Sequence, residues 1–264
     1  MSQSPLVSAV VLNYRSGKSA VECVRALAKQ TFADQMEIIV IDNHSKDDSI
    51  GILRNSLSRM PTVRIIETAQ NGGFGFGYNH GITYARGTYL LINNPDKRPE
   101  TEAVAMMVAA MEADPSIGIL GPKMMHPDGS RRLSMRSDPG PMKVMARRSV
   151  LGKIFPGIIK KYLLLDADPE KRREVDWVVG GCFMIRRDFF LALGGFDERF
   201  FLFFEDSDLC RKARVAGKKV VYFPDVTVMD RPRRLSGESF WDLFSKIGRA
   251  HMVSAVKYFW KWGV

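Results

Sequence analysis

The hydrophobic pattern of the first third of the chain predicts strands that alternate with helices. Short apolar runs rich in β-branched residues occupy 7–12, 37–41 and 63–66, and the segments between them, 18–30 and 50–57, carry apolar residues at helical spacing. Strands and helices that alternate at this pitch build a parallel sheet with crossover helices. The pattern therefore predicts a doubly wound α/β fold.

A fourth apolar run, 89–92, stops abruptly in polar residues and a proline. Asn93, Asn94, Pro95 and Asp96 follow it, and the strand should end there because proline has no N–H to donate to a ladder. In open α/β sheets, ligands bind outside the carboxyl ends of the strands. Asp96 is therefore a candidate for ligand binding, with a plain polar turn as the alternative.

Glycines at positions 72, 73, 75 and 77 predict a flexible loop ahead of a helix at 79–85. Glycine allows a ligand to approach the backbone closely. The loop resembles a phosphate-binding loop only loosely, because it does not follow the first strand and lacks Gly-Lys-Ser/Thr. A loop without a ligand remains the alternative.

The second half of the chain shows fewer regular elements. Residues 131–175 are basic and interrupted by prolines, which predicts an excursion that covers a cleft or a surface. The other expected elements are a helix at 100–112, strands at 117–120 and 175–185, a turn at 126–129, a helix at 187–193, a helix from 209 to a C′ glycine at 217, and a last strand at 219–223.

Composition narrows the class of protein. The chain has 264 residues, of which 45% are hydrophobic and 26% charged, as expected for one large or two small globular domains. No apolar run approaches the roughly 18 residues of a membrane span, no signal peptide is evident, and three scattered cysteines predict neither a disulfide framework nor a zinc site. The net charge of +10 predicts an anionic partner, which could be nucleic acid, a phosphorylated substrate or a lipid surface.

Polar residues at three predicted strand ends should share one edge of the sheet. These are Asn13 with Tyr14, Asp42, and Asp96. Such a set suits a nucleoside diphosphate, with Tyr14 stacked on the base, Asp42 accepting from base or ribose, and Asp96 holding a divalent ion. For Asp42, a helix-capping turn is the alternative.

Glu205 and Asp206 follow an apolar run of five residues, four of them phenylalanine, at a predicted helix N-terminus. Acidic residues in a first helical turn are common because the helix dipole favours them. An apolar environment, however, could raise one carboxyl pKa toward that of a general base.

Seven motifs together give the chain a resemblance to inverting, family-2 glycosyltransferases of the GT-A fold, in the rhamnosyltransferase-like branch that builds bacterial surface polysaccharides. Their order and spacing carry the resemblance over roughly 7–225. The motifs lie at 10–14, 41–45, 71–75 with Asn79, 94–96, 180–186, 194–197 and 205–210.

The resemblance implies a GT-A, Rossmann-like, doubly wound and mostly parallel sheet with an acceptor-side excursion and a C-terminal helical tail. It implies one domain over 1–264, with a nucleotide-sugar-binding half at 1–122, an acceptor-side half at 123–235 and a basic aromatic tail at 236–264.

The resemblance also implies roles for single residues. Asp96 would ligate Mg²⁺ or Mn²⁺, and Asp206, with Glu205 beside it, would be the catalytic base that deprotonates the acceptor hydroxyl. The positions that correspond to donor-binding residues are Asn13, Tyr14, Asp42, Gly73, Asn79 and Asn94.

One motif departs from the family. A histidine that helps to hold the metal usually follows the last strand, whereas this chain has Asp230 followed by Arg231, Arg233 and Arg234. Asp230 could replace the histidine as an oxygen ligand. Alternatively, the arginines could neutralise the diphosphate and make the metal dispensable.

The expected function is transfer of a sugar, with rhamnose from dTDP-rhamnose as the best candidate, to a polysaccharide or lipid-linked acceptor in cell-surface glycan synthesis. Aromatic and cationic residues near the C-terminus predict contact with a membrane interface, with packing on the core as an equally weighted alternative. The expected location is the cytoplasm, at the inner face of the membrane. The sequence assigns no oligomeric state.

Two other functions are less favoured. A sugar-nucleotide nucleotidyltransferase would need a triphosphate-binding glycine-rich loop after the first strand, and residues 13–17 do not form one. A non-catalytic nucleic-acid binder would fit the charge, but no reading motif accompanies it, so no nucleic-acid partner is expected.

Overall fold

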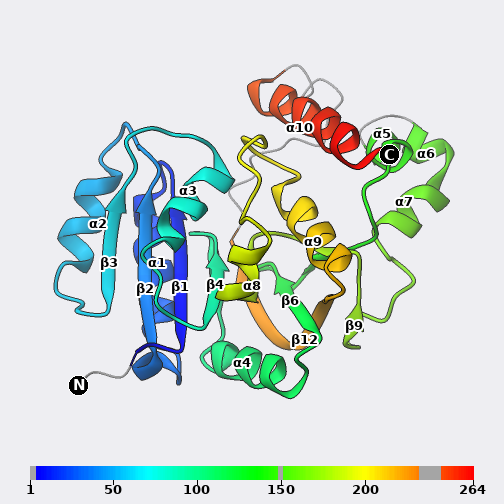
Figure 1. The fold of residues 1–264 in the computed structure, drawn as a ribbon. Helices are drawn as coiled ribbons and strands as arrows, with labels where there is room; N and C mark the ends of the chain where they lie inside the picture. Colours follow the sequence, from blue (N-terminus) through cyan, green and yellow to red (C-terminus); the bar gives the residue numbers. More distant parts are fainter. Residues whose placement is uncertain (1–3, 148–150, 232–244) are drawn as a thin grey trace.

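A mixed sheet forms the centre of the protein, as seen in the computed structural model, which describes residues 4–147, 151–231 and 245–264 (Figure 1). Within these residues the sheet has ten strands, in the order β3-β2-β1-β4-β11-β6-β12-β5, with β7 beside β6 and β9 beside β12. The strands are β1 Val7–Asn13, β2 Met36–Asp42, β3 Val63–Glu67, β4 Tyr89–Asn93, β5 Lys97–Pro99, β6 Ile117–Met125, β7 Arg131–Arg132, β8 Met135–Arg136, β9 Arg173–Glu174, β10 Trp177–Val178, β11 Cys182–Arg186 and β12 Lys219–Asp230.

The N-terminal half of the sheet is parallel, as predicted. Strands β3, β2, β1 and β4 run in one direction, and Asn13 of β1 lies opposite Asp42 of β2. On the other side of β1, Val11 lies opposite Asn93, the last residue of β4. The polar residues at these strand ends therefore lie along one edge of the sheet, as predicted.

Strand β12 is longer than the sequence pattern indicated. We expected it to end at Phe223, but it runs on to Asp230 after a register shift between Phe223 and Thr227. The extension is stabilised by pairing with β5, which places Asp230 opposite Lys97. Asp230 therefore lies at the end of this strand and not in the loop expected after residue 223.

Helices cover both faces of the sheet, which confirms the doubly wound arrangement. One core contains apolar residues of α1, α2 and α4, and the core on the other face contains residues of α3, α8 and α9. The helices are α1 Gly17–Leu27, α2 Ser49–Leu57, α3 Phe74–Ile82, α4 Ala103–Ala113, α5 Pro141–Arg147, α6 Leu151–Ile154, α7 Pro156–Tyr162, α8 Arg187–Ala192, α9 Glu205–Val215 and α10 Lys246–Trp262, with a 3₁₀ turn at Ala33–Gln35.

Helix α3 begins inside the stretch that we expected to be a glycine-rich loop. Its glycines serve close packing: a Cβ on Gly77 would lie 2.3 Å from Leu12 Cδ1, and one on Gly81 would lie 2.3 Å from Ile41 Cδ1. Because these helical glycines carry no side chain, α3 can lie directly on β1 and β2. The prediction of a helix starting only at residue 79 was wrong for this reason.

The basic excursion folds into short elements beside the sheet. Helices α5, α6 and α7 lie together at one end of the molecule (Figure 1). Strands β8 and β10 form a separate two-stranded sheet that packs against α9. The Trp177 indole N–H donates to the Ser137 carbonyl at 2.9 Å and fastens this small sheet to the chain ahead of α5.

Helix α10 packs Tyr258, Phe259 and Trp262 on the core, which was one of the two expectations for the tail, whereas Trp260 is exposed. Tyr258 is buried in a cluster with Val144, Phe200 and Phe204. The Asp208 carboxylate of α9 accepts hydrogen bonds from Lys261 Nζ and Trp262 Nε1, each at 2.8 Å. No helix within the described residues is long and apolar enough to cross a membrane.

Candidate active site

Asn13 and Asp42 form a buried polar pair at the edge of the parallel half-sheet. Asn13 Nδ2 donates to Asp42 Oδ2 at 2.6 Å, and the Ser45 N–H donates to Asp42 Oδ1 at 2.8 Å. Asn13 Oδ1 in turn accepts from the Ser16 hydroxyl at 2.9 Å. These bonds fix the two loops that follow β1 and β2, so the edge is preorganised.

Tyr14 lies next to this pair and points to solvent. Its side chain is 43% exposed, and the Arg15 guanidinium lies 5.3 Å from the centre of its ring. An exposed aromatic ring with a cation over it can stack on a nucleobase. The predicted role of Tyr14 in stacking on a base stays a prediction.

Gly73 joins the start of α3 to the segment that leads into α9. It has φ +100°, and a Cβ at this position would lie 2.3 Å from the Phe201 carbonyl oxygen. The next residue, Phe74, donates its N–H to that same oxygen at 2.8 Å. Glycine is required here because both its left-handed backbone and this close approach exclude a side chain.

Asn79 makes its contacts within the protein. Its Nδ2 donates to the Phe196 carbonyl and to Glu198 Oε1, both at 2.9 Å, and its Oδ1 accepts from the Phe196 N–H at 2.9 Å. In this arrangement Asn79 holds α3 to the 194–198 loop. Its predicted role in donor binding stays a prediction.

Gly180 and Gly181 connect the two predicted parts of the site, which are residues 94–96 and the pair Glu205-Asp206. The Asn94 N–H donates to the Gly181 carbonyl at 2.8 Å, and the Gly180 N–H donates to Asp206 Oδ2 at 2.8 Å. A Cβ on Gly180 would lie 2.8 Å from Asp206 Cβ. The glycine pair just before β11 therefore brings the end of β4 and the start of α9 to one place.

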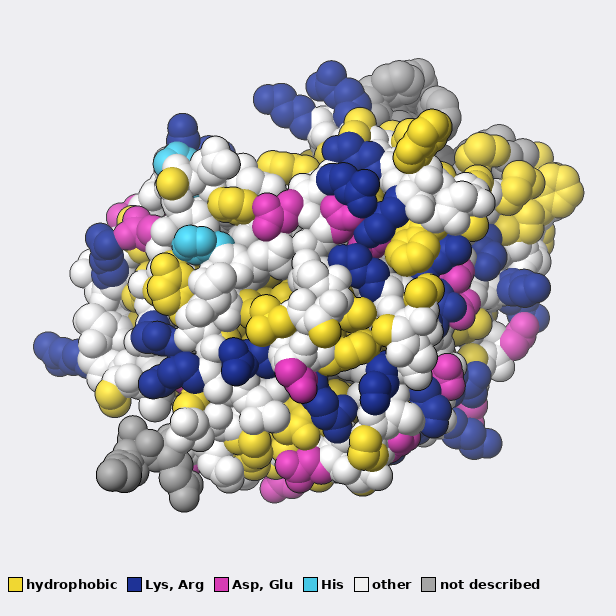
Figure 2. All heavy atoms as spheres, in the orientation of Figure 1, with side chains coloured by type: hydrophobic (Ala, Val, Ile, Leu, Met, Phe, Trp, Pro, Cys, Tyr) yellow, Lys and Arg dark blue, Asp and Glu magenta, His cyan; other side chains and the backbone are white. Residues whose placement is uncertain are grey.

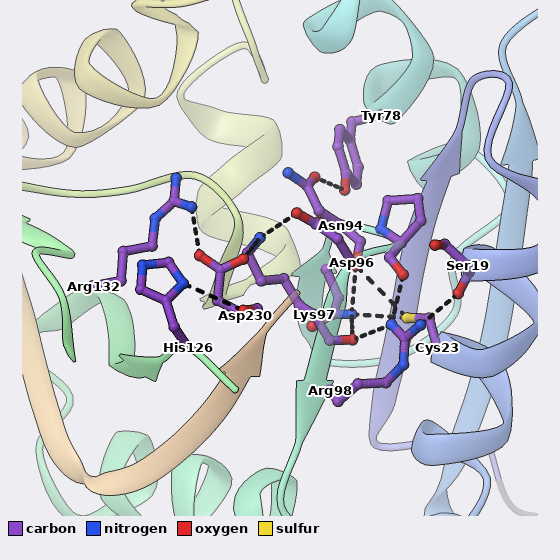
Figure 3. Close-up of polar contacts among 12 residues, drawn as sticks. Ser19, Cys23, Tyr78, Asn94, Asp96, Lys97, Arg98, His126, Arg132 and Asp230 are labelled. Carbon is purple, nitrogen blue, oxygen red and sulfur yellow. Dashed lines mark hydrogen bonds and ion pairs between the residues drawn. The ribbon is translucent and has the colours of Figure 1, made fainter. Parts of the chain in front are cut away.

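Asn94 and Asp96 differ in their surroundings (Figure 3). Asn94 Oδ1 accepts from the Tyr78 hydroxyl at 3.0 Å, which fixes the amide against α3. Asp96 is 23% exposed and its Oδ2 accepts from Lys97 Nζ at 2.7 Å. No described residue donates to Asp96 Oδ1.

Asp230 reaches Asp96 only through Lys97 (Figure 3). Lys97 Nζ lies 2.6 Å from Asp230 Oδ1, and the Arg132 guanidinium pairs with Asp230 Oδ2. His126 Nδ1 lies 3.4 Å from the carbonyl oxygen of Asp230. Both carboxylate oxygens of Asp230 therefore already have cationic partners. Arg231 follows directly, whereas Arg233 and Arg234 lie outside the described residues.

Of the two predicted metal ligands, Asp96 and Asp230, only Asp96 is free to bind a divalent metal in the described structure. Within the described ranges, no three His, Cys, Asp or Glu side chains gather into a group that could hold a metal ion. A cation bound together with a nucleotide needs only one or two carboxylates, because phosphates and water supply its other ligands. Asp96, partly exposed with Oδ1 open, meets that requirement, and Asp230 in its present pairing does not.

Glu205 and Asp206 open α9 after two residues with left-handed backbone. Phe203 and Phe204 have φ of 71° and 69° and turn the chain sharply into the helix. Asp206 Oδ1 accepts from the Ser207 N–H at 2.7 Å, so both of its oxygens receive backbone hydrogen bonds. Glu205 is buried, and no described residue donates to its Oε2.

The carboxyl pair has raised pKa values. Burial raises the pKa of Glu205 well above its ordinary value, and the Asp206 charge raises it further. Burial also raises the pKa of Asp206, although the N–H groups of Gly180 and Ser207 favour its ionised form. The neutral form is therefore favoured more strongly at Glu205 than at Asp206, whose two oxygens accept backbone hydrogen bonds.

Two residues at the site were not identified from the sequence. Lys97 looked like an ordinary lysine, because its burial depends on Asp230, 133 residues away. Arg136 is 6% exposed, stacks on the rings of Tyr162 and Trp177, and has Nε and Nη1 without a partner among the described residues. Burial lowers the pKa of Arg136 to about 9. Its charge favours the ionised form of Asp206.

Comparison with known proteins identifies the family. The family model "Glycosyl transferase family 2" matches residues 8–194. An N-acetylglucosaminyl-diphospho-decaprenol L-rhamnosyltransferase of Mycobacterium tuberculosis is 29% identical over 228 residues, which cover 81% of this chain and 73% of the relative. The rhamnosyltransferase WbbL of Escherichia coli is 25% identical over 214 residues and covers 73% of each chain.

Solved structures share the fold. A mannosyltransferase from Pyrobaculum calidifontis in complex with GDP-Man and Mn²⁺ matches with a TM-score of 0.61 and 19% identity over 88% of this chain. GalNAc-T7 with UDP, GalNAc and Mn²⁺ matches with a TM-score of 0.67 and 16% identity over 94% of this chain. The aligned regions span 59% and 50% of those two chains. The expected GT-A architecture is thereby confirmed. The chain is a rhamnosyltransferase-like glycosyltransferase and belongs to glycosyl transferase family 2.

Proposed function

We propose that this protein is an inverting glycosyltransferase that moves rhamnose from dTDP-rhamnose to a lipid-linked or polysaccharide acceptor in cell-surface glycan synthesis. The proposal rests on the hydrogen bonds of Gly180 and Gly181. They bring Asp206, a carboxylate with a raised pKa, close to residues 94–96, where we expect the diphosphate to bind. The printed names of the two rhamnosyltransferase relatives support the choice of sugar.

In the proposed reaction, the acceptor oxygen forms a bond to the anomeric carbon while the bond from that carbon to the diphosphate oxygen breaks. Attack opposite the leaving group inverts the anomeric configuration. Asp206 takes the proton of the acceptor hydroxyl, and the nucleoside diphosphate leaves with the bonding electrons. Neutral Glu205 keeps a second negative charge away from Asp206 and from the departing diphosphate.

The donor would bind along the edge built by β1, β2 and β4. We propose that Tyr14 stacks on the base, that Asp42 and Asn13 order the loops around base and ribose, and that Asn94 lies near the diphosphate. Gly73 and Asn79 support this site through the contacts of α3 with the 194–204 segment. Residues 1–122 would thus bind the donor and residues 123–235 the acceptor, within one domain.

A divalent cation, Mg²⁺ or Mn²⁺, is proposed at Asp96. When bound, it would neutralise charge on the leaving diphosphate. The open Oδ1 atom of Asp96 supports this assignment, as does the Mn²⁺ in the two solved relatives. Asp230 could serve as a second ligand only if Lys97 and Arg132 gave up its oxygens.

An anionic acceptor fits the other side of the site. Arg136 is buried and two of its nitrogens lack hydrogen-bond partners among the described residues, and a buried donor without a partner is costly. A phosphate of the acceptor would supply oxygens that accept from these nitrogens. The Mycobacterium tuberculosis relative is named for a lipid diphosphate, which supports this class of acceptor.

We also propose that one end of the molecule contacts the membrane that holds such an acceptor, at the cytoplasmic face. Figure 2 shows apolar side chains gathered over α6 and α7 beside Lys and Arg side chains. The exposed apolar residues of this end include Ile154, Phe155, Met142, Val256 and Trp260, and Trp260 is 89% exposed. Apolar residues with flanking cations suit an anionic lipid surface.

Donor binding and chemistry can be tested separately. We expect dTDP-rhamnose to raise the melting temperature by several degrees at about 100-fold excess over its Kd, and UDP- and GDP-sugars to raise it less.

The variant Asp206→Asn should keep this shift but lose about 10²- to 10⁴-fold in transfer rate. The exposed Asp188→Asn serves as the matched control and should transfer normally. If no sugar nucleotide stabilises the protein, the donor assignment is wrong. If Asp206→Asn stays active, the base assignment is wrong.

A further inference from the structure

The ammonium group of Lys97 lies between the two carboxylates that the sequence predicted as metal ligands. Its Nζ is 2.7 Å from Asp96 Oδ2 and 2.6 Å from Asp230 Oδ1. Figure 3 shows the three side chains converging from the turn between β4 and β5, from β5 and from the end of β12. A cation that belongs to the protein thus occupies the position between the carboxylates.

Burial makes this arrangement strong. Lys97 is 2% exposed and Asp230 is fully buried, so water competes weakly for either charge. Arg132 pairs with the other oxygen of Asp230. Two carboxylates face two cations, and the cluster is therefore neutral without any metal. A divalent ion bound to this neutral cluster would give it a net positive charge. A bound diphosphate would neutralise that charge.

The surrounding backbone makes room for Lys97 in this position. A Cβ on Gly181 would lie 2.6 Å from Lys97 Cε, so a larger residue at 181 would displace the lysine side chain. The pairing of β5 with β12 sets Lys97 directly opposite Asp230. The lysine is therefore held by the fold and is not an accidental surface contact.

We propose that Lys97 competes with the divalent cation for Asp96 and so sets the metal affinity of the site. This inference rests on the proposed role of Asp96 as the metal ligand. While Lys97 donates to Asp96 Oδ2, the carboxylate has less negative charge to offer a metal at Oδ1. Asp230 acts as a second counter-ion, which shares the charge of Lys97 and so weakens its attraction to Asp96. Lys97 is in this sense a positioning residue.

The test measures Mn²⁺ binding directly, by electron paramagnetic resonance, to the full chain saturated with dTDP. We expect Lys97→Met to bind Mn²⁺ about tenfold more tightly or better, since one neighbouring cation shifts the proton affinity of a carboxylate by about 1–3 pKa units. Lys123→Met is the matched control, because that lysine pairs with exposed Glu170 and should leave the affinity unchanged. Unchanged or weaker binding in Lys97→Met overturns the proposal.

A double-mutant cycle separates competition from direct ligation by Asp230. In Asp230→Asn, Lys97 has only Asp96 as an anionic partner, so Mn²⁺ should bind more weakly than in the wild type. In the double variant Lys97→Met with Asp230→Asn, the tight binding of Lys97→Met should return. If the double variant instead stays as weak as Asp230→Asn, Asp230 is a metal ligand and the competition mechanism is wrong.

Two further variants protect the test against a folding defect and against failure of the proposed function. Gly181→Ala should push the Lys97 side chain aside and tighten Mn²⁺ binding without removing a charge. Asp96→Asn in the Lys97→Met background should abolish the tight site, and persistence of that site overturns the proposal. Because Mn²⁺ binding needs no sugar transfer, a failed transfer assay would count against the proposed reaction and not against the role of Lys97.

Discussion

Burial raises the pKa of two adjacent carboxyl groups, Glu205 and Asp206, and their different hydrogen bonds make the increase larger for Glu205. Asp206 receives the N–H groups of Gly180 and Ser207, whereas no described residue donates to Glu205 Oε2. The sequence predicted an acidic pair with one raised pKa. It could not predict which member would be raised most, because the Gly180 N–H comes from a distant part of the chain.

The raised pKa of Glu205 makes a prediction about stability. The folded state binds this proton more tightly than the unfolded chain does, so wild-type stability falls as pH rises from the unfolded pKa of about 4.3 toward the folded value. Glu205→Gln lacks this loss. We expect it to be more stable than the wild type at pH 7, and the difference to vanish below about pH 4.

Urea unfolding at several pH values would measure this difference. Glu112→Gln, an exposed change on α4, should leave the pH dependence of the wild type intact. A Glu205→Gln protein that is less stable than the wild type at pH 7 would show that the buried carboxyl is ionised and compensated.

At the scale of elements, the position of α9 depends on the last helix of the chain. Asp208, two residues after the proposed base, is fully buried and accepts from Lys261 and Trp262 of α10. The sequence showed aromatic and cationic residues in the tail but could not show which of them turn inward. Tyr258 and Trp262 contact the core, and Trp260 faces solvent.

Breaking this contact should be costly. Asp208→Ala removes the fully buried carboxylate from Lys261, which keeps Asp197 as an anionic partner, and loss of one partner of a buried ion pair typically costs about 3–5 kcal/mol, so the lower end applies here. We expect a fall of about that size in the free energy of unfolding, with faster hydrogen exchange in α10. Asp166→Ala, which removes an exposed pair with Lys160, should change stability by only about 0.5 kcal/mol. Equal effects of the two changes would contradict the bridging role of Asp208.

On the scale of the whole molecule, the sequence predicted the parallel half better than the rest. Strands β1, β2 and β4 and the polar residues at their ends followed from local patterns. Strand β12 and helix α3 did not, because their extents depend on pairing with β5 and on glycines packed against distant side chains. Long-range partners decided the features that sequence periodicity missed.

The proposed membrane contact is testable with intact protein, since α10 packs on the core and its removal would disturb the fold. We expect the double change Val256→Asp with Trp260→Asp to reduce binding to vesicles rich in phosphatidylglycerol by about 30-fold, because two new charges at about 1 kcal/mol each cost about 2 kcal/mol near an anionic surface. Val215→Asp, an exposed apolar position on α9, is the matched control.

Co-sedimentation with phosphatidylglycerol and with neutral phosphatidylcholine vesicles gives the measurement. Equal pelleting of the wild type, the double variant and the control would exclude this end of the molecule as the contact. Loss of binding in the double variant alone would support it.

The pairing of β5 with the end of β12 also has a consequence for the order in which the protein folds. Asp96 and Lys97 are adjacent in the chain, but their partner Asp230 comes 133 residues after Lys97. Contacts at such separation are slow to form because a long loop must close first. An intermediate with only the parallel half formed would leave Lys97 without Asp230. If Asp96 binds the metal as proposed, Mn²⁺ affinity in the presence of dTDP should reach its native value during refolding only when β5 has paired with β12.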